Sequence, residues 1–308
     1  MEFFKHNTKI DFMAQRYRAA ILSAILFILS MGSLAINGLN WGLDFTGGAQ
    51  IQLSFPTEAN PTEIRERLQT AGFPEAVVIS YGTSKEVLVR LAPKKEMGSV
   101  GKDAVVAEVK QALPAAVVQQ VDYIGPQVGQ ELATKGVLAI VIALLGTMIY
   151  IALRFEFRFA VGSTVALIHD PILILGLFSF FHIEFNLIAL AAVLTVIGYS
   201  LNDTIVIFDR VRENFRKLRK STPIEVVNQS INQTLSRTLM TSALTLMVVL
   251  ALFFLGGTML HGFSLALIIG MVVGTYSSIY VAGSLAITLG LTRQHLLPVP
   301  KETLDNRP

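Results

Sequence analysis

Long apolar runs recur along the chain and are separated by shorter polar segments. The first run extends from Ala19 to Ile36 without interruption, and five more follow it. Each run is close to the roughly 20 residues that an α-helix needs to cross the hydrocarbon core of a bilayer. The pattern predicts six transmembrane helices, at residues 19–36, 136–153, 159–181, 187–208, 238–255 and 263–289.

The first apolar run is long for a signal peptide. It follows four basic residues, as a signal peptide would, but no Ala-x-Ala cleavage site comes after it. We therefore expect an uncleaved first span, preceded by an amino-terminal segment at residues 1–18.

Residues 37–135, between the first two spans, alternate between strand and helix patterns and predict a folded domain. Ile51, Leu53 and Phe55 alternate as in a half-buried strand, and Gly47-Gly48 is interpreted as a turn that enters this strand. The order β-α-β-β-α-β is that of a ferredoxin-like α+β domain. The predicted strands are Leu43 to Phe55, Ala76 to Tyr81, Glu86 to Leu91 and Val117 to Ile124, the predicted helices are Pro61 to Ala71 and Val100 to Leu113, and Ala92 to Gly101 is the expected mobile loop.

Composition agrees with a membrane protein. Of 308 residues, 52% are hydrophobic and only 15% are charged, which is too apolar for one soluble core. The chain has no cysteine, which excludes disulfides, thiol catalysis and thiolate metal sites. It also lacks a nucleotide-binding loop, a zinc-binding spacing and a recognisable Ser-His-Asp arrangement, so we expect no metal, no cofactor and no nucleic-acid partner.

The distribution of basic residues predicts the orientation. Six spans place both termini on one side of the membrane, and the segments on that side carry 16 Lys and Arg residues. The short opposite loops, residues 182–186 and 256–262, carry none. By the positive-inside rule both termini are cytoplasmic, with residues 209–237 as a cytoplasmic connection, residues 290–308 as a cytoplasmic tail and the 37–135 domain on the far side.

The cytoplasmic connection contains a helix start. Thr222-Pro223-Ile224-Glu225 has the form of a capping box with proline at the first helical position. Apolar residues then recur at helical spacing, which predicts a helix along the membrane surface that turns into the fifth span. The basic run before it, Arg210 to Lys220, is interpreted as a charged loop on anionic lipid.

Asp203 is the first candidate for function, because it lies within an otherwise apolar span. A carboxylate there costs roughly 2.5 to 3.5 kcal/mol on insertion scales and needs a partner, a water path or a proton. Arg237, at the start of the next span, should lie at a comparable depth, so an Asp203–Arg237 ion pair is expected. Such a pair can act as a proton relay, because the cation stabilises the charged carboxylate and this stabilisation is lost when the cation moves away. The alternatives are a permanent structural pair, or an Arg237 side chain that reaches the headgroups.

Other polar residues lie at membrane depth. Asn202 precedes Asp203, and His169-Asp170 lies near the middle of the third span. Pro171 follows directly, so the polar groups of His169 and Asp170 either satisfy backbone groups freed by a kink or take part in a relay. Two intramembrane aspartates also raise the hypothesis of an aspartyl protease, but its Gly-x-Gly-Asp pattern is absent.

The sixth span carries small residues every four positions. Gly270, Gly274 and Ser278 begin a stripe that continues to Ala286. Such a stripe permits close helix contact, so we expect it to pack on the fourth span or on a second protein.

With these features assembled, the chain resembles the SecF family, the smaller subunits of the bacterial SecD–SecF complex that assists protein export. The resemblance extends from the first span through the sixth. Four stretches carry it: Asn40 to Gly48, Gly198 to Arg210, Val211 to Arg216 and Ser236 to Leu239.

The resemblance implies a proton-driven member of the resistance-nodulation-division superfamily in the bacterial inner membrane. It implies that Asp203 and Arg237 belong to the proton path, that the 37–135 domain is periplasmic, and that SecD completes the site. The SecYEG translocon, YajC and unfolded preprotein would be the other partners. No covalent chemistry on the substrate is implied, so the chain is not expected to be an enzyme.

Two competing hypotheses remain. One is an exporter of small solutes or lipids from the same superfamily, although such exporters usually have twelve spans and two large domains in one chain. The other is a scaffold of the translocon in which Asp203 and Arg237 form an inert pair.

Overall fold

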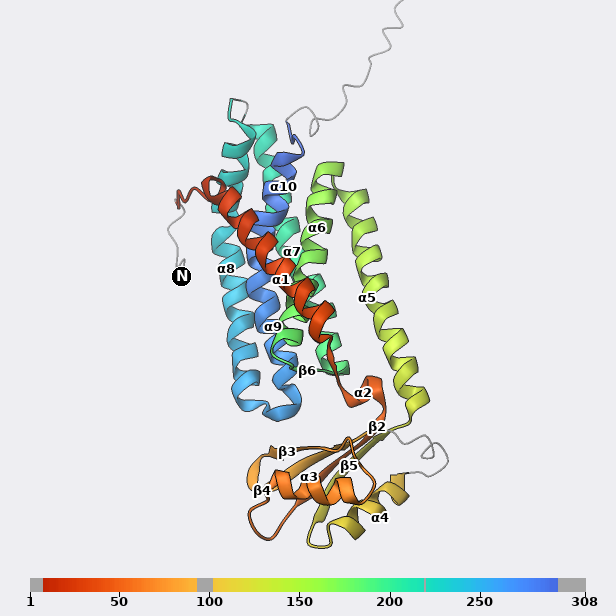
Figure 1. The fold of residues 1–308 in the computed structure, drawn as a ribbon. Helices are drawn as coiled ribbons and strands as arrows, with labels where there is room; N and C mark the ends of the chain where they lie inside the picture. The colour runs from red at the N-terminus through yellow and green to blue at the C-terminus, as the bar shows by residue number, and fades with distance from the viewer. Residues whose placement is uncertain (1–7, 93–101, 219, 293–308) are drawn as a thin grey trace, which may run out of the picture. The chain divides into compact units, whose positions relative to one another are not determined.

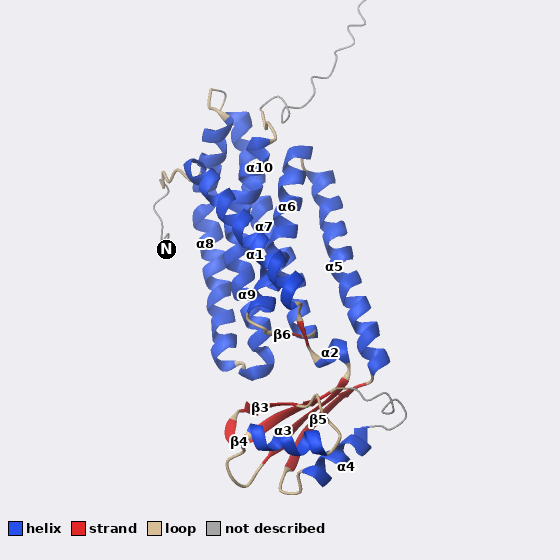
Figure 2. Ribbon diagram, in the orientation of Figure 1, coloured by secondary structure: helices blue, strands red, loops and turns tan. Residues whose placement is uncertain are grey.

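The computed structural model describes residues 8–92, 102–218 and 220–292. The described chain divides into two compact units. The first is helical, and the second combines a small sheet with helices (Figures 1 and 2). Residues 93–101 of the expected mobile loop, the start of the predicted second domain helix and most of the 290–308 tail lie outside the described residues.

Six helices in the described residues are long and apolar enough to cross a membrane. Their number matches the number of apolar runs in the sequence. The helices of the described chain are α1 (Arg16–Asn37), α2 (Leu43–Thr46), α3 (Pro61–Thr70), α4 (Lys102–Ala112), α5 (Pro126–Arg154), α6 (Phe157–Phe180), α7 (Leu187–Lys217), α8 (Pro223–Leu255), α9 (Gly257–Ser277) and α10 (Gly283–Thr288), with a 3-10 turn at Met13–Gln15 and a π-helical turn at Ser278–Ala282.

In the first unit α6, α7 and α9 are the buried helices. About half or more of the apolar window of each is buried, whereas α1, α5 and α8 are buried over only 11% of theirs. Helix α1 packs along α6, and α8 packs along α9 (Figure 1). The apolar surface left exposed on α1, α5 and α8 is the surface that lipid or another protein would cover.

The second unit has the ferredoxin-like topology that the sequence predicts. Its strands are β2 (Gly48–Ser54), β3 (Val77–Tyr81), β4 (Thr83–Leu91) and β5 (Val117–Ile124). They form an antiparallel sheet in the order β3-β4-β2-β5, and along the chain α3 lies between β2 and β3 and α4 lies between β4 and β5. A separate two-stranded sheet joins β1 (Asn40–Trp41) to β6 (Glu184–Phe185).

The core of this unit lies on one face of the sheet. Ile51, Leu53, Val87 and Val89 are completely buried. Because side chains alternate across a strand, these residues share a face, and α3 and α4 cover it (Figure 2). The domain therefore has a hydrophobic core of its own.

The predicted first strand, Leu43 to Phe55, is wrong at its start. Residues Leu43–Thr46 form the helical turn α2, and the strand begins only at Gly48. Gly47 ends α2 with a φ of 70°, and Gly48 follows with a φ of 119°. These conformations favour glycine, and they redirect the chain into the sheet.

The predicted surface helix is also wrong. The capping box forms as expected, with Thr222 and Glu225 bonded to each other's backbone N–H groups. However, α8 then continues unbroken to Leu255. The stripe that includes Val227 and Ile231 is buried in the helical core instead of lying on a membrane surface.

Candidate functional site

Asp203 lies in the middle of α7 and is buried, with 3% of its surface exposed. Its Oδ2 atom is buried and has no hydrogen-bond partner within the described part of the chain. A buried carboxylate oxygen without a partner is costly, and most buried polar atoms in proteins avoid that state. Asp203 is therefore the membrane carboxylate with capacity left to bind a proton or a water molecule.

The contacts between α7 and α8 place Asp203 opposite the Arg237-Thr238 region. The Tyr199 hydroxyl donates to Ser242 Oγ across the two helices, over 3.2 Å. The helices are antiparallel neighbours, so four residues forward from Tyr199 and four residues back from Ser242 reach the same level, which is Asp203 on α7 and Thr238 on α8. The hydroxyl of Thr238 is likewise buried without a partner.

Arg237 is exposed in the single chain and forms no direct ion pair with Asp203. The predicted ion pair is thus not formed in this structure. Arg237 nonetheless directly precedes Thr238, the α8 residue at the level of Asp203. Asn202, on the neighbouring position of α7, is also exposed and does not enter the buried site.

Asp170, the second membrane carboxylate, is completely buried and fully engaged. Its Oδ2 atom accepts hydrogen bonds from the hydroxyls of Ser200, over 2.5 Å, and Ser277, over 2.8 Å. Its Oδ1 atom lies 3.0 Å from Nδ1 of His169, whose ring stacks on Phe27 of α1. Asp170 therefore connects α6 with α7 and α9. Among the described residues its side chain forms no hydrogen bond to the backbone near Pro171.

The small-residue stripe of the sixth span packs on α7. A Cβ atom placed on Gly270 would lie 2.2 Å from Val196, and one on Gly274 would lie 3.0 Å from Ser200. One turn further, Ser278 Oγ is 2.8 Å from Thr204 Oγ1. The two helices thus run in parallel with matched steps of four residues.

The π-helical turn begins at the end of this matched contact. It spans Ser278–Ala282. Consecutive serines diverge at this point, because Ser277 reaches Asp170 while Ser278 reaches Thr204. Single π-turns inside helices often occur at functional sites. Thr204 is the next residue after Asp203, so the π-helical turn that follows α9 contacts α7 directly beside Asp203.

Three residues of this site were not singled out from the sequence: Thr238, Ser200 and Ser277. Serine and threonine are common in membrane helices and bond most often to their own backbone, so composition does not mark them. A signal was present for Ser200 and Thr238, because both lie in the motifs around Asp203 and Arg237.

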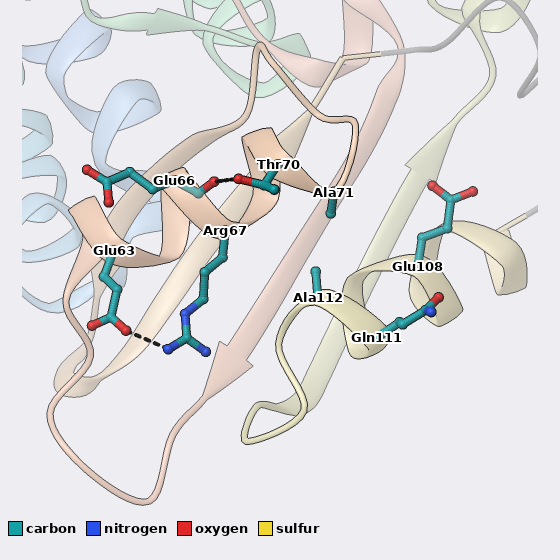
Figure 3. Close-up of a pocket in the computed structure, with 8 residues that line it drawn as sticks. All are labelled: Glu63, Glu66, Arg67, Thr70, Ala71, Glu108, Gln111 and Ala112. Atoms are coloured by element: carbon teal, nitrogen blue, oxygen red, sulfur yellow. Dashed lines mark hydrogen bonds and ion pairs between the residues drawn. The ribbon is translucent and has the colours of Figure 1, made fainter.

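The second unit contains an open groove between α3 and α4 (Figure 3). Its volume of about 790 Å³ would accommodate a small molecule, but it is wide open and lined mostly by charged and polar residues. Arg67 is paired with Glu63 over 2.7 Å. No group of three or more metal-binding side chains occurs in the described residues. The groove therefore offers no chemistry that competes with the membrane site.

Comparison with known proteins identifies the family. Residues 104–292 match the family described as protein export membrane protein SecD/SecF, C-terminal, and residues 32–55 match the SecD/SecF GG motif. The chain belongs to the SecD/SecF family. Its relatives place it on the SecF side of that family.

The chain is 47% identical to the protein translocase subunit SecF of Vibrio alginolyticus, over 96% of this chain and 95% of that protein. It is 44% identical to SecF of Escherichia coli O157:H7, over 99% of this chain and 96% of that protein. The relatives are thus similar over their whole length, and SecF is the family branch of this multi-pass membrane protein.

Solved structures show the same fold. The crystal structure of SecDF from Thermus thermophilus, a translocon-associated membrane protein, matches with a TM-score of 0.82 and 37% identity over 93% of this chain. A SecDF structure in the super-membrane-facing form matches with a TM-score of 0.69 over 92% of this chain. The chain spans 39% of the length of each of these SecDF chains.

Proposed function

We propose that this protein is an accessory subunit of the bacterial Sec protein-export machinery that couples proton flow to late steps of preprotein translocation. The observation that carries the proposal is the buried Asp203 carboxylate with one unpartnered oxygen, at the level of Thr238 and its neighbour Arg237 on α8. The names of its SecF relatives support the export role.

A carboxylate in this setting is suited to bind and release a proton. Desolvation disfavours its charged form, whereas a nearby cation favours it. A change in the distance between Asp203 and Arg237 would therefore change the proton affinity of Asp203. Thr238, at the same level and with an unpartnered hydroxyl, can donate to the carboxylate or hold a water molecule beside it.

The proposed site is completed by a second protein of the SecD type. Arg237 and Asn202 are exposed on membrane helices, and exposed polar groups at that depth are costly in lipid. The SecDF relative is a longer chain, of which this protein matches 39%. For this protein a separate SecD would supply the remaining part. SecYEG, YajC and unfolded preprotein would be the further partners.

The proton-motive force is strong enough for this role. One proton that crosses 100 mV supplies about 2.3 kcal/mol. A conformational equilibrium changes tenfold for about 1.4 kcal/mol, so one proton can bias a domain movement by more than tenfold. The substrate itself needs no covalent chemistry, which is why an enzymatic activity is not proposed.

The proposal includes an orientation in the inner membrane, with both termini cytoplasmic and the second unit periplasmic. Because the chain has no cysteine, single cysteines can report it directly. In intact spheroplasts, a membrane-impermeant thiol reagent should label Ser84→Cys in the second unit and should not label Lys220→Cys. The reverse labelling would contradict the orientation.

The decisive experiment measures proton flux and preprotein export in vesicles that contain the SecD–SecF complex. Asp203→Asn should abolish both proton-dependent activities while the complex still assembles. Asp209→Asn is the matched control, because Asp209 lies on the same helix but is 45% exposed and paired with Arg154. It should change neither activity.

The same measurement separates the competing functions. A scaffold predicts that Asp203→Asn changes neither flux nor export. An exporter of small solutes or lipids predicts loss of flux with undiminished preprotein export. Loss of both activities in Asp203→Asn, with normal activities in Asp209→Asn, supports the proposed function.

A further inference from the structure

The segment Asn40–Gly48, which follows the first span, makes a parallel strand pair with the loop before α7. Asn40 aligns with Glu184, and Trp41 aligns with Phe185. The pairing is extended by the Gly42 amide, which donates to the Phe185 carbonyl over 2.8 Å. All of these residues belong to the second unit.

Within this segment, Asp44 holds the amino terminus of α7. Its Oδ2 atom accepts a hydrogen bond from the backbone N–H of Leu187, over 2.8 Å. Leu187 is the first residue of α7. The first N–H groups of a helix have no partner inside the helix, and a carboxylate there also complements the helix dipole. Asp44 is therefore an N-terminal cap supplied from a distant part of the chain.

Side chains reinforce the link on both sides. Trp41 and Phe45 pack against the Phe185 ring, with ring centroids 5.9 and 6.0 Å away. Glu184 forms an ion pair with Arg90 of β4. The loop before α7 is thus attached both to the Asn40–Gly48 segment and to the sheet.

Glycines allow the segment to fit closely against its neighbours. A Cβ atom on Gly42 would lie 2.8 Å from the Cβ of Asn186. One on Gly48 would lie 2.2 Å from the Leu91 carbonyl of β4, and one on Gly47 would lie 2.9 Å from Pro126, the first residue of α5. The segment is therefore held between the sheet, the start of α5 and the start of α7.

We propose that the Asn40–Gly48 segment is the mechanical connection that transmits movement between α7 and the second unit. Helix α7 is continuous from Leu187 through Asp203, a length of about 24 Å at 1.5 Å per residue. A shift of α7 that accompanies proton binding at Asp203 is then passed through Asp44 and β6 to the sheet. This inference rests on the proposed function, and it assigns Asp44 as a positioning residue.

The test uses the assembled complex with SecD and three variants. Asp44→Ala removes the cap, Asp44→Asn keeps an acceptor for the Leu187 N–H, and Asn60→Ala is the matched control. Asn60 caps α3 in the same unit, because its side chain accepts a hydrogen bond from the Thr62 N–H. Proton flux, preprotein export and hydrogen exchange of residues 184–190 are measured for each variant.

Asp44→Ala should uncouple the two activities. We expect proton flux close to that of the parent and faster hydrogen exchange at residues 187–190. We expect export to fall about fivefold, because loss of one helix cap typically changes the equilibrium constant for helix formation by about that factor. Asp44→Asn should restore most of the export. Asn60→Ala should leave both activities unchanged.

A second variant tests the same connection independently of the carboxylate. Gly42→Ala forces a side chain against Asn186 and should separate β1 from β6, whereas Gly125→Ala, which has open space around its Cβ, should not. Normal export in both Asp44→Ala and Gly42→Ala would overturn the inference, as would a parallel loss of flux and export in both. Failure of the proposed function has a different signature, namely unchanged flux in Asp203→Asn.

Discussion

The Ser200 hydroxyl donates to Oδ2 of Asp170 over 2.5 Å, and Ser200 lies three residues before Asp203 on α7. One segment of α7 therefore contacts Asp170, whose two carboxylate oxygens are both hydrogen-bonded. The same segment carries Asp203, which has one carboxylate oxygen without a partner among the described residues. Asp170 therefore bonds across three helices, whereas Asp203 is the proposed proton-binding group.

Asp170→Ala should destabilise the helical unit. The change leaves the Ser200 hydroxyl buried without its acceptor, whereas the Ser277 hydroxyl loses Asp170 but keeps the Gly274 carbonyl, 3.1 Å away. Hydrogen bonds between membrane helices contribute about 0.6 kcal/mol on average and up to about 1.7 kcal/mol, so a loss of about 1 to 3 kcal/mol is expected. Thermal unfolding of the detergent-solubilised complex measures it. Ser264→Ala is the control, because in the described part of the chain the Ser264 hydroxyl bonds only to the Leu260 carbonyl of its own helix. Equal stability of the two variants would contradict the anchoring role.

Gly270→Ala should also reduce stability, because the added methyl group would lie 2.2 Å from Val196 on α7. Overpacking of a tight contact typically costs about 1 to 3 kcal/mol. Gly198→Ala, on an open face of α7, provides the comparison and should be neutral or slightly stabilising. The yield of folded complex and its melting temperature are the readouts. An unchanged melting temperature for Gly270→Ala would show that α7 and α9 are less closely packed.

Thr238→Val should separate function from stability. It removes a buried hydroxyl that has no partner, so the fold should not be weakened. If that hydroxyl serves the Asp203 site, proton flux through the complex should fall several-fold. Thr234→Val is the matched control, since the Thr234 hydroxyl already bonds to the Ser230 carbonyl of its own helix. Full proton flux in Thr238→Val would exclude this threonine from the path.

Asn232→Ala should release the segment that precedes α1. Asn232 bonds to both the N–H and the carbonyl of Ile10, at 2.9 and 2.8 Å. Each bond contributes about 0.5 to 1.5 kcal/mol, so trypsin should cleave after Lys9 several-fold faster in the variant. Gln229→Ala, an exposed position on the same helix, should be cleaved at the parental rate. Equal rates in both variants would mean that these bonds do not restrain the segment.

The sequence pattern was sufficient to predict the six helices, the order of strands and helices in the sheet domain and the capping box of α8. Each of these depends on residues that lie near one another in the chain. The solvation cost of charge in an apolar run was likewise sufficient to single out Asp203 and Arg237 as candidates.

Tertiary structure decided the features that join distant residues. Asp170 finds hydroxyl partners 30 and 107 positions away, and Asp44 caps a helix 143 positions away. It also decided that residues 43–46 form a turn and that the stripe after Thr222 is buried. Local periodicity carries no information on which helix lies opposite a given face. Only the packed chain could therefore distinguish Asp170, whose oxygens are both hydrogen-bonded across helices, from Asp203, which keeps an unpartnered oxygen among the described residues.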